Sequence, residues 1–161
     1  MIALRDHGSS QKYYHDCIGH NYRMEGIQGA ILDVKLKHLH EWTESRRKKA
    51  DLYRKYLADV KDVVVPIEMP GVKHVYHLFV VRVAQRNDLQ KYLQDNEIYT
   101  GIHYPIPCHL QKAYAFLHQP KGTFPIAEKM ADEILSLPMY AELTEKEIQF
   151  VSHKIRDFHK S

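Results

Sequence analysis

Apolar residues recur at near-helical spacing from residue 27 to residue 58, in a stretch without proline. The positions that carry this pattern are Ile27, Ala30, Ile31, Val34, Leu39, Trp42, Ala50, Tyr53 and Leu57. The spacing predicts one long helix, or a broken pair of helices, over roughly residues 27–58. Since its second half is highly charged, this helix cannot be buried on all sides, and we expect it to join two lobes.

Other segments have the composition of β-strands. Residues 75–83 are rich in β-branched and aromatic residues that alternate between two faces, which predicts a strand. Residues 98–103 predict a second strand, and the three valines at 63–65, which precede Pro66, predict a brief one. We expect residues 136–139 to form a short extended edge.

Three further helices are predicted in the second half of the chain. Residues 87–96 have the pattern of a helix capped by its first residue, Asn87. Residues 125–135 predict another helix, with a proline in its first turn. Thr144 and Glu147 have the spacing of a capping box, which predicts the start of a closing amphipathic helix.

The remaining segments are expected to form loops. The first 25 residues are polar and contain turn residues, and residues 104–111 hold two prolines that prevent a regular strand. Residues 112–117 predict a short helical turn. The order of elements indicates an α+β fold, in which a small antiparallel sheet has helices packed on one side. We divide the chain into three parts: a loop segment at residues 1–26, a connecting helix at residues 27–58 and a small α+β domain at residues 59–161.

The composition narrows the functional classes. The 161 residues are 44% hydrophobic and 27% charged, as in a soluble globular protein. The 23 basic and 20 acidic residues are scattered, so the net charge of +3 gives no nucleic-acid footprint. No apolar run approaches the roughly 20 residues of a membrane span, and the N-terminus has no signal-peptide pattern. We therefore expect a cytoplasmic protein with two free thiols, Cys17 and Cys108.

Common catalytic and metal-binding patterns are not recognisable. His103 and His109 flank two prolines and have no acidic partner nearby in the sequence, so we expect no metal site. Neither Cys108 nor Ser136 lies in the strand-turn-helix context of a nucleophile. No glycine-rich phosphate loop lies between a strand and a helix.

Asn21 and Arg23 are the residues best suited to bind a ligand. They lie two positions apart in a loop before the predicted long helix, where an amide, a guanidinium and a helix dipole all favour an anionic oxygen. On chemistry alone a second interpretation stays open. Asn21 could cap the helix while Arg23 pairs with a surface acid.

Three blocks of sequence resemble one protein family. The first runs along residues 7–46 and contains His-Gly, Tyr-x-His, Gly-x-Asn-x-Arg-Met, Ile-Gln, Lys-Leu, Trp and Arg. The second is residues 101–111, and the third runs from residues 124–128 to residues 135–138. In this order they resemble the DegT/DnrJ/StrS-type sugar aminotransferases, which depend on pyridoxal phosphate (PLP) and install amino groups on keto-sugar nucleotides.

The resemblance implies a fold and a site. It implies that the last domain corresponds to the small C-terminal domain of a fold-type I, aspartate-aminotransferase-like enzyme, and that residues 1–26 end a large PLP-binding domain. It also implies a homodimer in which Asn21, with Arg23 close by, reaches the phosphate of the partner subunit's cofactor. His103, Tyr104 and His109 would lie near the substrate entrance.

The sequence also departs from the family's pattern. The Schiff-base lysine of the family lies upstream of the segment that matches residue 5 onward, so we assign no catalytic residue here. We therefore expect a C-terminal portion that binds no PLP and performs no transamination alone. In a complete enzyme the amino group would come from glutamate. The alternative is a non-catalytic dimerisation or regulatory module derived from such an enzyme.

Overall fold

A computed structural model describes residues 1–160, which form two compact units. We call residues 1–40 the N-terminal unit and the residues from 41 onward the C-terminal unit, and we describe each by itself. Both contain a small antiparallel pair of strands together with helices, so the α+β prediction is confirmed. No helix formed by residues 1–160 is long and apolar enough to cross a membrane.

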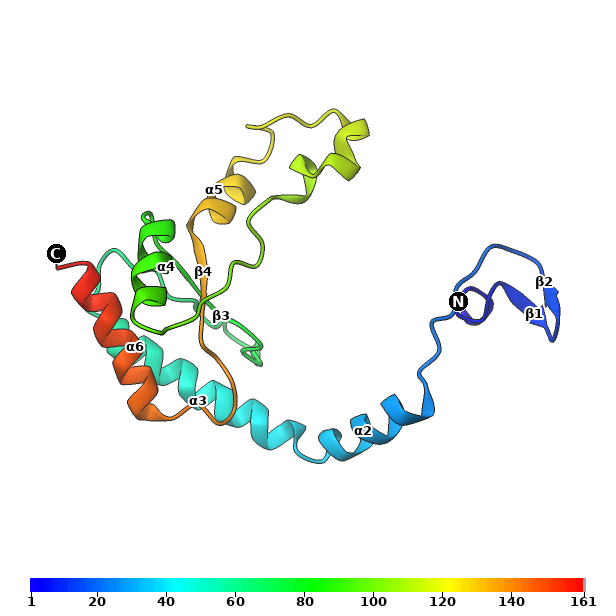
Figure 1. Ribbon diagram of the computed structural model, residues 1–161, viewed down its shortest axis with the longest axis horizontal. Coiled ribbons are helices and arrows are strands. Elements are labelled where there is room, and N and C mark those ends of the chain that lie inside the picture. The colour runs from blue at the N-terminus through cyan, green and yellow to red at the C-terminus, as the bar shows by residue number, and fades with distance from the viewer. Residues whose placement is uncertain (161) are drawn as a thin grey trace. The chain divides into compact units, whose positions relative to one another are not determined.

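The N-terminal unit contains more regular structure than a loop. Its elements are α1 (Ile2–Arg5), β1 (Ser9–Gln11), β2 (Tyr14–His15) and α2 (Gly26–Leu36), and β1 pairs with β2 (Figure 1). The prediction that residues 1–25 form only loop is therefore wrong. Backbone hydrogen bonds hold the segment, for example from His20 N to Leu4 O at 2.8 Å. None of the large apolar side chains of residues 1–25 is buried, and no hydrophobic pattern in the sequence marks α1, β1 or β2.

The long helical segment is a broken pair, as one of the two predicted alternatives stated. Lys37 and His38 separate α2 from α3 (Leu39–Leu57). A capping box of Glu25 and Gln28 begins α2, which has no buried residue. By contrast, α3 buries Ala50, Tyr53 and Leu57, which share one helix face at spacings of three and four.

The sheet of the C-terminal unit is centred on two buried strands. β3 (Phe79–Arg82) pairs antiparallel with β4 (Ile134–Leu137). Val64 forms a bridge with Arg82 on the outer side of β3, and Gly101 forms one with Ser136 on the outer side of β4. The segment around Ser136 is therefore an interior strand and not the extended edge that we expected. The predicted strands at 63–65 and 98–103 shrink to these single bridges.

The predicted strand at 75–83 is too long at its N-terminal end. Tyr76 has a positive φ of 46°, which turns the backbone out of the extended region. Its ring then packs into the core that contains Phe79, with 6.2 Å between the ring centroids. Strict alternation had placed these two side chains on opposite faces, so the conformation of Tyr76 is what shortens the strand.

The C-terminal unit also contains helices and short 3-10 turns, and the 3-10 turns lie away from β3 and β4 (Figure 1). These elements are α4 (Arg86–Asp95), η1 (Cys108–Leu110), η2 (Lys112–Leu117), α5 (Pro125–Glu133) and α6 (Glu145–Phe158). The predicted capping box of Thr144 and Glu147 is present at the start of α6. The predicted cap at Asn87 is wrong, because α4 starts one residue earlier and Asn87 accepts a hydrogen bond from the Arg86 side chain.

Hydrogen bonds and an ion pair centred on Glu68 connect residues 66–76 to α3. The carboxylate of Glu68 accepts hydrogen bonds from Arg47 Nη1 at 2.7 Å, from His74 N at 3.1 Å and from the Tyr76 hydroxyl at 3.1 Å. The hydrogen bond from Arg47, followed by those from His74 and Tyr76, lowers the pKa of Glu68 to about 2. This network stabilises the turn that buries Tyr76.

Glu68 should therefore make stability depend on acid pH. A carboxyl group with a lowered folded-state pKa stabilises the fold above its unfolded value near 4.5, and this contribution disappears as the pH falls toward about 2. Urea unfolding at pH 6 and pH 3 is expected to show a smaller acid loss in Glu68→Gln than in the wild type. Glu142→Gln, at an exposed position of the same unit, is the control. Equal acid losses in all three proteins would contradict the assignment.

Candidate functional site

Asn21 and Arg23 lie next to each other on the surface of the N-terminal unit. Asn21 forms a backbone bridge with Asp6, and its Oδ1 accepts hydrogen bonds from Arg23 Nε at 3.3 Å and from Arg23 N at 3.4 Å. Arg23 Nη1 lies 3.6 Å from Asp6 Oδ1. The alternative that Asn21 caps the helix is wrong, because Glu25 occupies the N-cap position of α2. The other half of that alternative, a pairing of Arg23 with a surface acid, is present as the contact with Asp6.

This arrangement presents hydrogen-bond donors to solvent. Because Arg23 occupies the amide oxygen of Asn21, the Nδ2 group of Asn21 can donate outward, and no residue among 1–160 accepts from it. The Arg23 side chain is 56% exposed, so its guanidinium can also reach a ligand. An amide donor beside a guanidinium suits a phosphate or carboxylate oxygen, while Asp6 neutralises part of the charge when the ligand is absent.

Two glycines hold the backbone of this site together. A Cβ atom on Gly8 would lie 1.6 Å from the carbonyl oxygen of Cys17, and one on Gly19 would lie 2.1 Å from Gly8 N. Gly8 also has a positive φ of 74°. The two segments therefore touch through their backbones, which sets the position of Asn21 two residues later.

The second group of candidate residues lies in the C-terminal unit, on the segment after Gly101. His103 Nδ1 lies 2.9 Å from the Ser136 hydroxyl, and the peptide bond between His103 and Tyr104 is cis. Tyr104 is 75% exposed. His103 and Tyr104 are therefore accessible to a ligand, and the side chain of His109 is nearly buried, at 8% exposed.

His109 has an acidic partner that the sequence did not reveal. Its Nε2 donates at 3.0 Å to Oε1 of Glu128, which lies 19 residues away along the chain. The same carboxylate accepts from Gly122 N at 2.8 Å and from Phe124 N at 3.2 Å. The hydrogen bond from Gly122, with those from His109 and Phe124, lowers the pKa of Glu128 below its ordinary range. Glu128 thus ties both ends of residues 109–124 to the first turn of α5.

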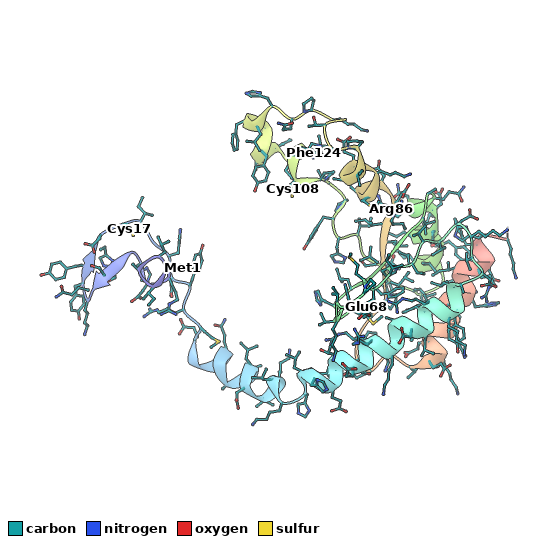
Figure 2. All side chains as sticks on the ribbon, turned by 180° about the vertical axis from the view of Figure 1, so that it is seen from behind. Met1, Cys17, Glu68, Arg86, Cys108 and Phe124 are labelled. Atoms are coloured by element: carbon teal, nitrogen blue, oxygen red, sulfur yellow. The ribbon has the colours of Figure 1, made fainter. Side chains whose placement is uncertain are left out.

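An apolar cleft of about 490 Å³ has the side chain of His109 in its wall. Its walls come from the segment that follows His103, from α5 with its N-cap residue, and from the start of β4. They consist of Tyr104, Ile106, Pro107, Cys108, His109, Phe124, Ala127, Met130, Ala131 and Ile134. Figure 2 shows Cys108 and Phe124 near each other in this part of the C-terminal unit. The cleft brings Tyr104 and His109 together, whereas His103 faces Ser136.

Sequence reasoning missed Ser136 and Glu128 as partners of the two histidines. They lie 33 and 19 residues from His103 and His109, and no periodic pattern reports such pairs. The only available signal was that both lie in the third block of the family resemblance. Among residues 1–160, no group of three or more His, Cys, Asp or Glu side chains could hold a metal ion.

Comparisons with known proteins agree with these blocks. The sequence model of the DegT/DnrJ/EryC1/StrS aminotransferase family matches residues 1–156. The pleiotropic regulatory protein of Geobacillus stearothermophilus is 46% identical over 160 residues, which is 98% of this chain and 43% of that protein. The UDP-N-acetyl-3-dehydro-alpha-D-glucosamine 3-aminotransferase of Acidithiobacillus ferrooxidans is 38% identical, over 97% of this chain and 42% of that protein.

A solved structure has the same fold. The X-ray structure of S. venezuelae DesV in complex with a ketimine intermediate superposes with a TM-score of 0.92 and 36% identity. The superposition covers 99% of this chain and 43% of DesV. The chain thus spans less than half the length of the relatives that it matches.

Gly19→Ala is expected to displace the Asn21 segment, because the added Cβ has no room beside Gly8. The amides of His20 and Tyr22, which donate to Leu4 and Arg5, should lose protection from hydrogen exchange. Gly29→Ala is the matched control, since its Cβ would meet only Met24 Cε at an ordinary 3.8 Å. Retained protection of both amides in Gly19→Ala would refute the proposed contact.

Glu128→Ala is expected to loosen residues 109–124, because it removes the acceptor of three donors. Hydrogen exchange at the amides of Gly122 and Phe124 should accelerate, because both amides lose their hydrogen-bond acceptor. Asp132→Ala, an exposed position on the same helix, serves as the control. The idea fails if both variants exchange at the wild-type rate.

Proposed function

Because this chain belongs to the DegT/DnrJ/EryC1/StrS aminotransferase family, we propose that it forms the C-terminal part of a PLP-dependent sugar aminotransferase. The complete enzyme transfers an amino group from glutamate to a keto-sugar nucleotide. The observation that carries the proposal is the family match over residues 1–156, together with the outward donors of Asn21 and Arg23. The printed name of the A. ferrooxidans relative, which describes a UDP-linked dehydro sugar, supports this substrate class.

Asn21 and Arg23 are the residues of this chain that would hold the cofactor. When bound, PLP supplies an aldehyde for covalent attachment of the amino group and a ring that accepts electrons. The phosphate of PLP needs donors, and an exposed amide beside a guanidinium fits that requirement. We propose that both residues hold the phosphate of the partner subunit's cofactor, so that the site is shared within a homodimer.

His103, Tyr104 and His109 contribute to the other end of the site in this proposal. The exposed His103 and Tyr104 would contact the sugar nucleotide near the entrance. His109, which Glu128 holds in place, would shape the wall of the apolar cleft. These side chains would bind and orient the substrate, and the chain contributes no lysine that we assign to the chemical step. The domain boundaries at 26 and 58 and the cytoplasmic location also remain proposals.

A second function has specific support. The G. stearothermophilus relative, 46% identical to this chain, is named a pleiotropic regulatory protein. A non-catalytic dimerisation or regulatory module could keep the same α+β domain. It would need the folded unit and its dimer contacts, and would not need Asn21 to bind a phosphate.

A measurement of cofactor binding by a complete subunit that carries this sequence distinguishes the two functions. Asn21→Ala is expected to weaken PLP retention by about 1–3 kcal/mol, because one hydrogen bond to a charged group is lost. Equilibrium dialysis measures this change, and Asn87→Ala, at an exposed position on α4, is the control. Unchanged retention in Asn21→Ala would refute the role of Asn21. Turnover of a keto-sugar nucleotide by this chain alone would refute its catalytic incompleteness.

A further inference from the structure

The imidazole of His103 is held by a buried hydroxyl. Ser136 lies within β4, is 5% exposed and places its Oγ 2.9 Å from His103 Nδ1. Its backbone is fixed on both sides, because Ser136 pairs with Val80 of β3 and with Gly101. The hydrogen bonds from Gly101 N to Ser136 O and from Ser136 N to Gly101 O measure 3.1 and 2.7 Å. The hydroxyl therefore has a well-defined position.

Gly101 supports the same ring from a second direction. A Cβ atom at Gly101 would lie 2.7 Å from His103 Cε1, 3.4 Å from Nδ1 and 3.5 Å from Nε2. Real Cβ atoms do not approach other atoms as closely as 2.7 Å, so the imidazole occupies the space that any other residue would fill. The absence of a side chain at Gly101 lets the ring reach Ser136.

The burial of Ser136 also indicates which nitrogen of neutral His103 carries the proton. Among residues 1–160, the side chain of His103 is the one hydrogen-bond partner of the Ser136 hydroxyl. If the hydroxyl only accepted, its hydrogen would be buried without a partner, which costs about 1–3 kcal/mol. The hydroxyl therefore donates to Nδ1. Neutral His103 then carries its proton on Nε2 and can donate it away from Ser136.

We propose that Ser136 and Gly101 are positioning residues, which hold His103 so that its Nε2–H donates to an oxygen of the sugar-nucleotide substrate. This inference rests on the proposed function, since it needs His103 to face substrate. It adds to that function the two residues that set the orientation and the proton position of the ring. The acceptor is an oxygen of either the phosphates or the sugar.

The first test measures the ring in this chain without any ligand. Side-chain ¹⁵N NMR of the wild type is expected to show a proton on Nε2 of His103, an accepting Nδ1 and a single side-chain rotamer. Ser136→Ala and Gly101→Ala should each give rotamer averaging, by loss of the hydroxyl and by steric displacement. Ser136→Thr, which keeps a hydroxyl, should retain the wild-type signature.

Protection of the Gly101 and Ser136 amides shows whether each variant keeps the backbone bridge. If Ser136→Ala or Gly101→Ala loses this protection, only the other substitution is compared with the wild type. A wild-type His103 signature in Ser136→Ala or Gly101→Ala with an intact bridge would overturn the positioning role.

The second test uses the complete subunit. Ser136→Ala is expected to raise the KM for the keto-sugar nucleotide by about 3- to 10-fold, the equivalent of one hydrogen bond, and to leave the half-reaction with the amino donor unchanged. Ser136→Thr should restore the KM. If the inhibition constant of the free nucleoside diphosphate rises in parallel, the acceptor is a phosphate oxygen; if only the KM rises, it is a sugar oxygen.

The two tests fail separately. The substitutions could release the ring in the first test and leave the KM unchanged in the second. That result would support the positioning of His103 and would refute its contact with substrate. A wild-type signature in Ser136→Ala or Gly101→Ala with an intact bridge would refute the positioning and leave the family-based function untouched.

Discussion

The pairing of β3 with β4 is the interaction on which the C-terminal unit depends. β4 lies between β3 on one side and Gly101 on the other, so its backbone groups are satisfied within the unit. Leu135 and Leu137 are buried in the same core as Phe79 and Val81. Since Ser136 lies between these two leucines, the strand that completes the core also carries the side chain that contacts His103.

Glycine serves a related purpose at both candidate sites. In the N-terminal unit, Gly8 and Gly19 allow two backbone segments to touch, and Asn21 follows directly. In the C-terminal unit, Gly101 leaves room for the ring of His103. Both sites thus depend on glycines that have no Cβ atom. An added methyl group would disturb each site without changing its charge or polarity.

The sequence predicted elements with a strong local signal and missed those that depend on distant partners. The capping box at Thr144 and the helical spacing of Ala50, Tyr53 and Leu57 are local, and the structure contains both. The strand at 75–83 failed because tertiary packing favours a positive φ at Tyr76 over strict alternation.

The candidate sites follow the same division. Asn21 and Arg23 could be selected because two donors lie two positions apart in one loop. The partners of the two histidines could not be identified from the sequence, because Ser136 and Glu128 approach them only after α5 and β4 have folded. Side-chain chemistry is visible in the sequence, whereas the orientation of each side chain depends on contacts far along the chain.

The exposed face of α2 links the fold to the proposed assembly. Ile27, Ile31 and Leu32 are 78%, 56% and 53% exposed, and the helix is only 11 residues long. Isolated helices shorter than about 12–15 residues are marginal in water, and most helical stability comes from packing of an apolar face. An exposed apolar face of this kind is typical of a surface that another part of a protein covers. Under the proposed function, a second subunit or the remainder of a longer subunit would provide that cover.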